Sequence, residues 1–436
     1  MNVRAQTVDN TTTRAQPGTG FLYGWLLVAL FVEYARPTNQ LTFLEFPFFY
    51  SLVPMTLLLV QSFAQGLRPM KEIFADQIAK WVLIFLGVIT LSWAATGFDA
   101  FGSSVFQAML GYMFLFFLIA RIVTSESRLR GVIIALVVAH FYLLAMNFNV
   151  LTDPTQRQYL VGGTFLGDGN DYSLSMCILI PCMIEVALSA RSKLRKLLSW
   201  ASVIVIIMAI IATQSRGGTL GIAAVMAYLW WRSPKKAVAA VAILMVAGIM
   251  LLYAPAQYFQ RMGTVTGMTI DGSAQGRLDA WSGAIGMGAK NPLLGIGAGQ
   301  FGARWGRTAH STYMLAFAEL GLPGFLCVIM LVFGNIRASL RMRNAVLTRA
   351  GPDPEPDLTR KLRLLDLTNV GMVAFAVTGA FLSATYYPHI YVVAALLISA
   401  RIIAARTAGL QHDSGLANTR ILANAGPPNR IQRNHR

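Results

Sequence analysis

The sequence predicts an all-α, polytopic integral membrane protein of about twelve transmembrane helices. Its composition is the first reason, because 55% of the 436 residues are hydrophobic and only 13% are charged. The second is that the apolar residues gather into runs of roughly 15–22, the length that spans a bilayer. The third is the placement of basic residues, which cluster between every second pair of runs. A soluble enzyme or a nucleic-acid-binding module is therefore not expected.

The candidate spans follow one another along most of the chain. They cover residues 21–36, 46–63, 79–96, 104–121, 131–148, 172–189, 197–213, 218–231, 237–253, 312–334, 368–385 and 388–404. The first and the eighth are short, and Glu33 interrupts the first. This count divides the chain into a segment 1–20, nine spans within 21–253, a loop 254–311, a tenth span 312–334, a loop 335–367, two spans within 368–404 and a tail 405–436.

The basic residues orient this arrangement. With the N-terminus in the cytoplasm, 28 of the 36 lysines and arginines fall on the cytoplasmic side and 8 on the other. Cytoplasmic loops carry such an excess of basic residues in helical membrane proteins. We therefore interpret the net charge of +17 as an orientation signal and as attraction to anionic membrane lipids, with no nucleic-acid partner.

The three long polar segments differ in character. The loop 254–311 contains tryptophans and the phrase NPLLGIGAGQFG, so we expect it to fold against the bundle and to be partly helical, with Asp271 or Ser273 capping a helix through Trp281. The loop 335–367 is basic at both ends and rich in Pro and Asp in its middle, which predicts a flexible cytoplasmic connector with helical ends. The tail 405–436 is predicted to be cytoplasmic and disordered.

Arginines on the outer side are the first candidate site residues. Arg216, in TQSRGGTLG, lies in a turn too short to leave the membrane surface, and its two glycines permit close backbone approach. Arg277 lies in GRLDAW, and Arg304 and Arg307 lie in ARWGRTAH. Guanidinium groups match phosphate oxygens in two-point contacts, so such a set suits a diphosphate. The alternatives are a snorkelling role for Arg216 and a surface ion pair of Arg277 with Asp279.

His310 and Glu319 are the other candidates. His310 precedes Ser311 and Thr312 at the predicted entry of the tenth span, where an imidazole could accept a proton from an acceptor hydroxyl. A lone histidine beside an apolar helix is otherwise a structural residue. Glu319 lies deeper in the same span, and a carboxylate inside a membrane is costly enough to indicate a function.

A metal site has weaker support. Cys177, Cys182 and Cys327 all lie inside apolar runs without C-x-x-C spacing, so they predict neither a disulfide framework nor a metal site. Asp168, Asp171 and Asp271 offer hard oxygen ligands as an alternative. We expect no cofactor and no metal ion.

Taken together, these motifs resemble the O-antigen ligase and polymerase superfamily of bacterial envelope glycosyltransferases. The likeness covers about Gly162 to Phe333 and rests on SRGG, GRLDAW, NPLLGIGAGQF and HSTYMLAFAELGLPG. GTFLGDGNDYSLSM resembles a further family segment, with Asn170 and Asp171 at its usual polar positions. The N-terminal ARP is similar to the subgroup of O-glycosylation ligases associated with exosortases.

The resemblance implies a metal-independent, C-type glycosyltransferase fold in the bacterial inner membrane, active on the periplasmic face. It implies transfer of a glycan from undecaprenyl diphosphate to a hydroxyl of lipid A core, another lipid, a glycan or a protein. Arg216 and Arg277 match the family's diphosphate-binding arginines and His310 its histidine near the acceptor; Arg304, Arg307, Asn170 and Glu319 are further candidates for binding the diphosphate or the glycan. A polymerase with the same donor is one alternative, and a polysaccharide or lipid transporter is another.

Overall fold

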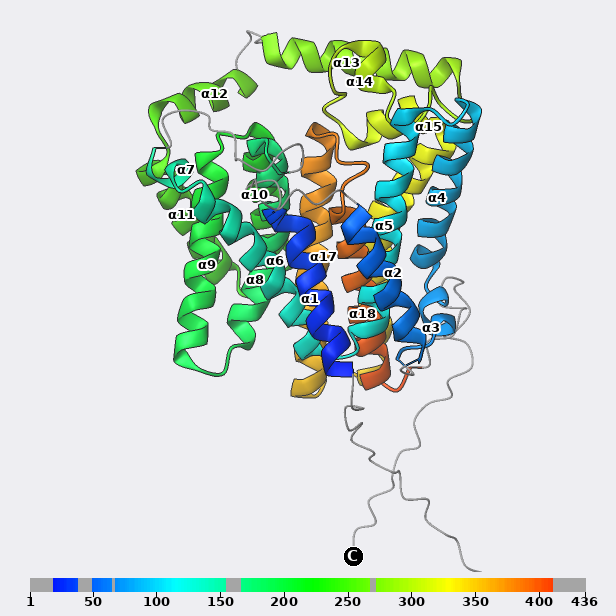
Figure 1. Ribbon diagram of the computed structural model, residues 1–436. Coiled ribbons are helices and arrows are strands. Elements are labelled where there is room, and N and C mark those ends of the chain that lie inside the picture. Colours follow the sequence, from blue (N-terminus) through cyan, green and yellow to red (C-terminus); the bar gives the residue numbers. More distant parts are fainter. Residues whose placement is uncertain (1–18, 38–48, 65–66, 154–165, 267–271, 411–436) are drawn as a thin grey trace, which may run out of the picture.

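A computed structural model of the chain describes residues 19–37, 49–64, 67–153, 166–266 and 272–410. The described residues form helices and turns without a strand, as Figure 1 shows. The helices are α1 (Thr19–Ala35), α2 (Phe49–Ala64), α3 (Met70–Phe74), α4 (Gln77–Ala95), α5 (Ala100–Ile122), α6 (Glu126–Met146), α7 (Asn149–Thr152), α8 (Gly169–Ser189), α9 (Lys193–Ala212), α10 (Arg216–Arg232), α11 (Lys236–Tyr253), α12 (Ala256–Thr266), α13 (Gly272–Lys290), α14 (Phe301–Trp305), α15 (Thr312–Ile329), η2 (Met330–Gly334), α16 (Asn335–Ala350), α17 (Pro356–Thr378), η3 (Gly379–Phe381) and α18 (His389–Thr407).

The prediction of a polytopic helical membrane protein agrees with this architecture. Within the described ranges, nine helical segments are long and apolar enough to cross a membrane. They are α4, α5, α6, α8, α9, α11, α15 to α16, α17 with η3, and α18. The three other predicted spans coincide with α1, α2 and α10, which have 17, 16 and 17 residues. The count of twelve spans therefore stays a prediction.

Many of the helices begin at a residue whose side chain caps them. An oxygen of each cap accepts a hydrogen bond from a backbone N–H two or three residues further on, which satisfies a donor that the helix leaves open. The capping residues are Asp76, Asp99, Ser125, Asp168, Ser192, Ser215 and Ser311. Local sequence therefore determines where these helices start.

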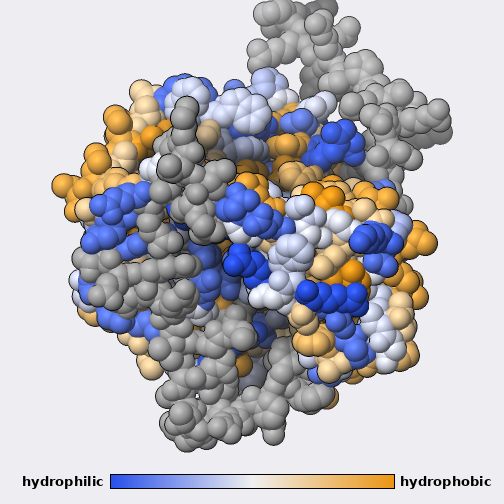
Figure 2. Space-filling view, turned by 90° about the horizontal axis from the view of Figure 1, so that it is seen from above, coloured by the Kyte–Doolittle hydropathy of each residue, from blue (hydrophilic) through white to orange (hydrophobic). Residues whose placement is uncertain are grey.

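The bundle has a buried centre and an apolar periphery. The spanning part of α18 is 89% buried and that of α8 is 83% buried, whereas that of α11 is 6% buried. α17 packs against both α8 and α18. In the view from above, hydrophilic side chains gather toward the middle of the face and apolar ones toward its rim (Figure 2). An apolar rim around a polar centre is the pattern expected of a bundle surrounded by lipid.

The predicted outer and inner segments lie at opposite ends of the bundle. Helices α12, α13 and α14 cover one end, and α13 runs across it (Figure 1). The α8–α9 turn, α3, the start of α17 and the end of α18 lie at the other end. This separation follows the alternation of basic and non-basic loops along the sequence. Which end faces the cytoplasm stays a prediction.

The structure revises two predicted boundaries. The helical ends predicted for the connector 335–367 are present, over Asn335–Ala350 and again from Pro356, and they leave only residues 351–355 between the two helices. No glycine or proline interrupts the first stretch, whereas Gly351, Pro352 and Pro354 end it. The predicted span 368–385 also ends early, because α17 stops at Thr378 and residues 382–388 form an irregular loop. The tail from residue 411 and residues 1–18 lie outside the described part of the chain.

Candidate active site

Trp281 joins three parts of the chain at the end covered by α13. Its indole nitrogen donates a hydrogen bond to the carbonyl oxygen of Ala309 at 3.0 Å. Its ring packs beside Phe381, with the ring centroids 6.4 Å apart. The predicted helix through Trp281 is therefore confirmed, although the expected caps Asp271 and Ser273 lie outside the residues whose side chains are described. α13, the segment before α15 and η3 meet at this residue.

Arg277 is positioned by the same helix. It lies four residues before Trp281, and residues with this spacing share one face of a helix. Arg307 reaches the same place, because a Cβ built on Gly276 would lie 2.0 Å from an Arg307 guanidinium nitrogen. Asp279, the predicted surface partner of Arg277, accepts a hydrogen bond from Gln275 at 2.9 Å. The Arg307 guanidinium therefore lies against the residue that precedes Arg277 on α13.

Arg216 begins α10, and the residue before it connects this helix to α8. The Ser215 hydroxyl donates to the Asn170 side-chain oxygen at 2.8 Å and accepts from the backbone N–H of Gly218 at 3.1 Å. The segments SRGG and GDGND are thus in direct contact, through two residues that are 45 positions apart in the sequence. Asn170 therefore supports the start of the helix that carries Arg216.

The second glycine of SRGG is required by packing. A Cβ on Gly218 would lie 2.8 Å from the Cβ of Ser173 on α8, which is closer than real Cβ atoms approach. The first glycine, Gly217, faces η3, because its Cβ would lie 3.6 Å from the Cβ of Phe381. Phe381 therefore lies between Gly217, next to Arg216, and Trp281. Through these contacts the structure brings the segments of Arg216, Arg277 and His310 to one place.

His310 lies in a constrained segment between α14 and α15. Its φ angle is 48°, in the left-handed region that non-glycine residues seldom adopt. Ala309 before it accepts the bond from Trp281, and Ser311 after it caps α15. Strained backbone of this kind concentrates at functional sites when its surroundings hold it in place.

Thr312 anchors the other side of this segment to the loop 382–388. Its hydroxyl donates to the Leu382 carbonyl oxygen at 2.7 Å and accepts from the Ala384 N–H at 3.1 Å. The Thr385 hydroxyl donates to the Thr312 carbonyl oxygen at 2.8 Å. The backbone segment that carries the partly buried His310 is therefore held between α13 and this loop.

Glu319 is buried, and its carboxylate accepts hydrogen bonds from other parts of the protein. It is 2% exposed, and its carboxylate accepts from the backbone N–H groups of Gly299 and Phe301 at 2.9 and 2.8 Å. The Tyr386 hydroxyl donates to it at 2.7 Å. Its backbone is also close to the motif NPLLGIGAGQF, because a Cβ on Gly295, where φ is 65°, would lie 2.2 Å from the Glu319 carbonyl carbon. These contacts show Glu319 anchoring the motif to α15, while its predicted contact with substrate stays a prediction.

Arg304 also makes a local contact. Its guanidinium donates to the carbonyl oxygen of Ile296 at 2.9 Å and so links α14 to the same motif. Arg307, by contrast, extends to Gly276 beside Arg277. Of these two candidates for binding the diphosphate, Arg307 therefore has the position closer to the other candidate residues.

Two adjacent tyrosines that sequence reasoning missed tie the site together. Tyr386 donates to Glu319 on α15, and Tyr387 donates to Asp171 on α8 at 2.8 Å. Burial and then the neighbouring carboxylate raise the pKa of Tyr386 well above its usual value, and the same causes raise the pKa of Tyr387. Both hydroxyls therefore remain protonated donors. The signal was the polar sequence TYYPH, whose two tyrosines form the short gap between the predicted spans 368–385 and 388–404.

The carboxylates of the alternative metal site already have protein partners. Asp168 accepts from the Asn170 backbone N–H at 3.0 Å, and Asp171 accepts from Tyr387. Asp271 lies outside the described residues. Both described carboxylates thus hold the start of α8 in position.

One comparison with known proteins gives a family. Residues 201–329 match the family model described as O-antigen ligase. The match covers less than a third of the chain, and it makes this segment similar to the O-antigen ligase family. It supports the resemblance to the O-antigen ligase and polymerase superfamily. No curated protein matches the chain.

The matched segment includes most of the candidate residues. It covers Arg216, Arg277, His310 and Glu319, together with the whole of α13 and the motif NPLLGIGAGQF. Asn170 and the loop 382–388 lie outside the matched residues, although both contact it. The assignment to the exosortase-associated subgroup stays a prediction.

Proposed function

We propose that this protein transfers a glycan en bloc from undecaprenyl diphosphate to an acceptor hydroxyl at the end of the bundle covered by α13. We place this end on the periplasmic side of the bacterial inner membrane, in agreement with the distribution of basic residues. Arg216 and Arg277, with Arg307 beside them, bind the diphosphate in this proposal. Charge-assisted, two-point contacts suit that role.

The reaction forms a bond between the acceptor oxygen and the anomeric carbon of the glycan. The bond from that carbon to the diphosphate oxygen breaks, and undecaprenyl diphosphate leaves with the electron pair. His310 accepts the proton of the acceptor hydroxyl as the new bond forms. The arginines stabilise the charge that develops on the leaving group, which is the electrostatic part of catalysis. Neither step requires a redox cofactor.

One observation carries this proposal. Trp281 contacts both Ala309, next to His310, and Phe381, which packs against Gly217, next to Arg216. Arg277 lies one helical turn away on the same face. The segments of Arg216, Arg277 and His310, which are 61 and 33 residues apart in sequence, therefore lie at one end of the bundle, and this supports the proposal.

A reconstituted transfer assay tests the proposal. The purified protein in lipid nanodiscs would receive a glycan linked to undecaprenyl diphosphate, together with a lipid A core, a glycan or a protein as acceptor. We expect release of undecaprenyl diphosphate together with glycosylated acceptor. Mass spectrometry of the product separates a ligase, which transfers one glycan to the acceptor, from a polymerase, which lengthens the lipid-linked glycan. The absence of both products with every acceptor would reject a glycosyltransferase acting on this donor.

A further inference from the structure

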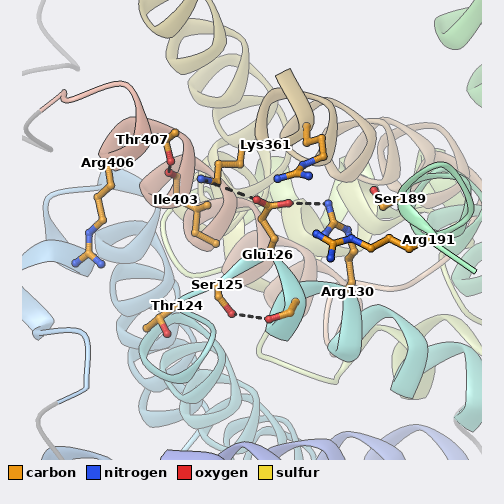
Figure 3. Close-up of a pocket in the computed structure, with 12 residues that line it drawn as sticks. Thr124, Ser125, Glu126, Arg130, Ser189, Arg191, Lys361, Ile403, Arg406 and Thr407 are labelled. Atoms are coloured by element: carbon orange, nitrogen blue, oxygen red, sulfur yellow. Dashed lines mark hydrogen bonds and ion pairs between the residues drawn. The ribbon is translucent and has the colours of Figure 1, made fainter. Parts of the chain in front are cut away.

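A polar cavity lies at the end of the bundle opposite to α13. Its volume is about 510 Å³. Four parts of the chain line it: the α5–α6 turn with the start of α6, the α8–α9 turn, the first turns of α17 and the last turns of α18. Figure 3 shows Lys361, Glu126 and Arg130 in its middle, with Arg406 and Arg191 on opposite sides. None of its lining belongs to the candidate active site.

The lining of this cavity is strongly basic. Five cationic side chains face a single carboxylate, that of Glu126; the cations are Arg130, Arg191, Arg360, Lys361 and Arg406. They come from four segments of the chain. Positive residues at cytoplasmic helix ends are expected from topology alone. Topology does not require them to converge on one cavity.

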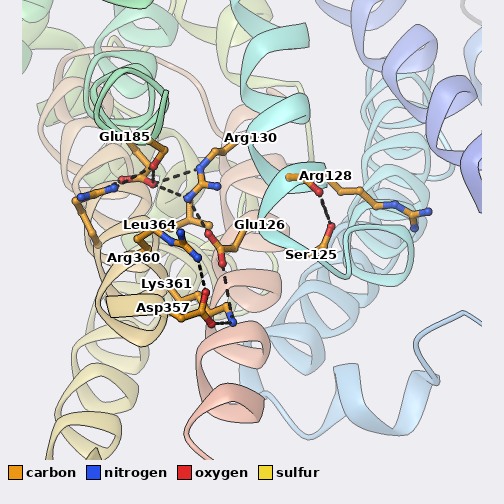
Figure 4. Close-up of polar contacts among 12 residues, drawn as sticks. Ser125, Glu126, Arg128, Arg130, Glu185, Asp357, Arg360, Lys361 and Leu364 are labelled. Atoms are coloured by element: carbon orange, nitrogen blue, oxygen red, sulfur yellow. Dashed lines mark hydrogen bonds and ion pairs between the residues drawn. The ribbon is translucent and has the colours of Figure 1, made fainter. Parts of the chain in front are cut away.

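Neighbouring carboxylates neutralise only part of this charge (Figure 4). Arg130 donates to Glu126 at 2.8 Å and to Glu185 at 2.9 Å. Glu185 also accepts from Arg363 at 2.7 Å, which leaves one carboxylate shared between two arginines.

The remaining pairs join the start of α17 and the end of α18 to nearby acids. Asp357 pairs with both Arg360 and Lys361, and the Lys361 ammonium nitrogen lies 2.5 Å from a carboxylate oxygen of Asp357. Arg406 pairs with Glu72 at 2.6 Å. Five of these cations pair with four carboxylates, and Arg191 adds a sixth positive charge, which leaves an excess of two. The cations are Arg130, Arg191, Arg360, Lys361, Arg363 and Arg406, and the carboxylates are those of Glu72, Glu126, Glu185 and Asp357.

Arg191 is the cation best placed to receive a ligand. Among the described residues it forms no ion pair or hydrogen bond, and it lies exposed at the edge of the cavity. Arg130 and Lys361 are only 19% and 17% exposed, so solvent screens their charges less than those of surface residues. The excess charge therefore favours an anion inside the cavity.

We propose that this cavity binds a phosphate ester, with Arg191 and Arg406 contacting its oxygens from opposite sides. Arginine forks match phosphate oxygens, and pockets of roughly 300–1,000 Å³ hold small organic ligands. The volume therefore accommodates a phosphate together with a group of the size of glycerol. Such a group is present in the headgroup of an anionic phospholipid and in soluble phosphate esters. Both sources present the same chemistry to the cavity.

Binding measurements on the full-length protein test this proposal. One arm titrates glycerol 3-phosphate into protein in phosphatidylcholine nanodiscs by calorimetry. The other arm measures retention of phosphatidylglycerol by native mass spectrometry. The test variant is Arg191→Glu with Arg406→Glu, and the control is Arg195→Glu with Arg349→Glu. The control makes the same change in net charge at two exposed arginines outside the cavity.

We expect the test variant to bind at least about tenfold more weakly in one arm, while the control binds like the unchanged protein. Weakening in the glycerol 3-phosphate arm assigns the site to a soluble ester, and weakening in the lipid arm alone assigns it to a headgroup. Equal weakening by both variants would mean general surface attraction and would overturn the proposal. No saturable binding in either arm would overturn it as well. Since these readouts do not involve glycan transfer, they are independent of the proposed function.

Discussion

The indole N–H of Trp281 donates a hydrogen bond to the carbonyl oxygen of Ala309 at 3.0 Å, across 28 residues of sequence. This bond joins the helix that carries Arg277 to the residue before His310. It also explains how His310 keeps a φ angle of 48°, because the carbonyl group preceding the imidazole is held from outside. The distance between the proposed proton acceptor and the proposed diphosphate-binding arginines therefore depends on this contact.

Replacing Trp281 with Phe should lower the rate of transfer by roughly tenfold, because it removes a hydrogen bond worth about 0.5–1.5 kcal/mol and leaves the aromatic ring in place. The rate constant for transfer, measured at saturating donor, checks this expectation. Trp305→Phe is the matched control, since Trp305 packs on Gly283 of the same helix without contacting Ala309. Equal losses in the two variants would show that the bond to Ala309 has no special role.

Replacing Arg216 or Arg277 with Ala should nearly abolish transfer, because each loses charge-assisted contacts worth on the order of 2–4 kcal/mol in the transition state. Lysine should restore little activity at either position, since an ammonium group does not reproduce the two-point geometry. Lys290→Ala, at the exposed end of α13, provides the control for a lost positive charge on the same helix. Normal transfer by both alanine variants in a purified assay would refute the diphosphate assignment.

Removing the His310 imidazole should leave donor binding intact and lower transfer by roughly 10²–10⁴-fold, the contribution of a positioned proton acceptor. His310→Gly is the informative variant, because glycine adopts the positive φ angle of this position without strain, whereas alanine does not. Comparable losses in both variants would identify the imidazole as the cause. Recovery of transfer in the glycine variant would instead identify the backbone as the cause.

The same residue predicts a pH dependence. A histidine that accepts a proton must be neutral, so transfer should fall as the medium is acidified through the range in which histidine titrates. This fall should be absent from the residual activity of His310→Gln. A donor-binding defect in His310→Ala as large as its transfer defect would make the residue a diphosphate ligand or a purely structural one.

Replacing Glu319 with Gln should destabilise the protein by about 1–3 kcal/mol. The carboxylate accepts from three buried donors, and the N–H₂ group of an amide cannot accept a hydrogen bond, so at least one donor would lose its partner. Thermal unfolding in detergent measures the loss. Tyr386→Phe removes one of those donors, so the double variant should lose less stability than the sum of the single variants. A fully stable Glu319→Gln protein with defective glycan binding would instead support the predicted contact with substrate.

A cysteine introduced at Gly302 should react with an impermeant maleimide in intact spheroplasts, and one at Asp353 should not. Gly302 has open space around it at the end covered by α13, and Asp353 lies in the short connection between α16 and α17. The native cysteines are buried and contribute little background. The opposite labelling pattern would reverse the proposed orientation.

The sequence by itself determined the helical membrane class, most of the helix limits and the motifs that resemble the O-antigen ligase family. These features depend on local chemistry: the length of an apolar run, a Ser or Asp that caps a helix, and the glycines and prolines that end one. Arg216, Arg277 and His310 were also identifiable, because each stands in a short recognisable motif. Glu319 was identifiable as unusual, although its partners were not.

Only the tertiary structure decided which of these residues meet. Ser215 contacts Asn170 across 45 residues, Tyr386 reaches Glu319 across 67, and Tyr387 reaches Asp171 across 216. Such contacts follow from the order in which helices pack side by side, and hydrophobic patterning specifies that a helix is buried without specifying its neighbours. The loop 382–388 shows this most clearly, because its polar residues acquire partners only when α8, α15 and α17 are assembled around them.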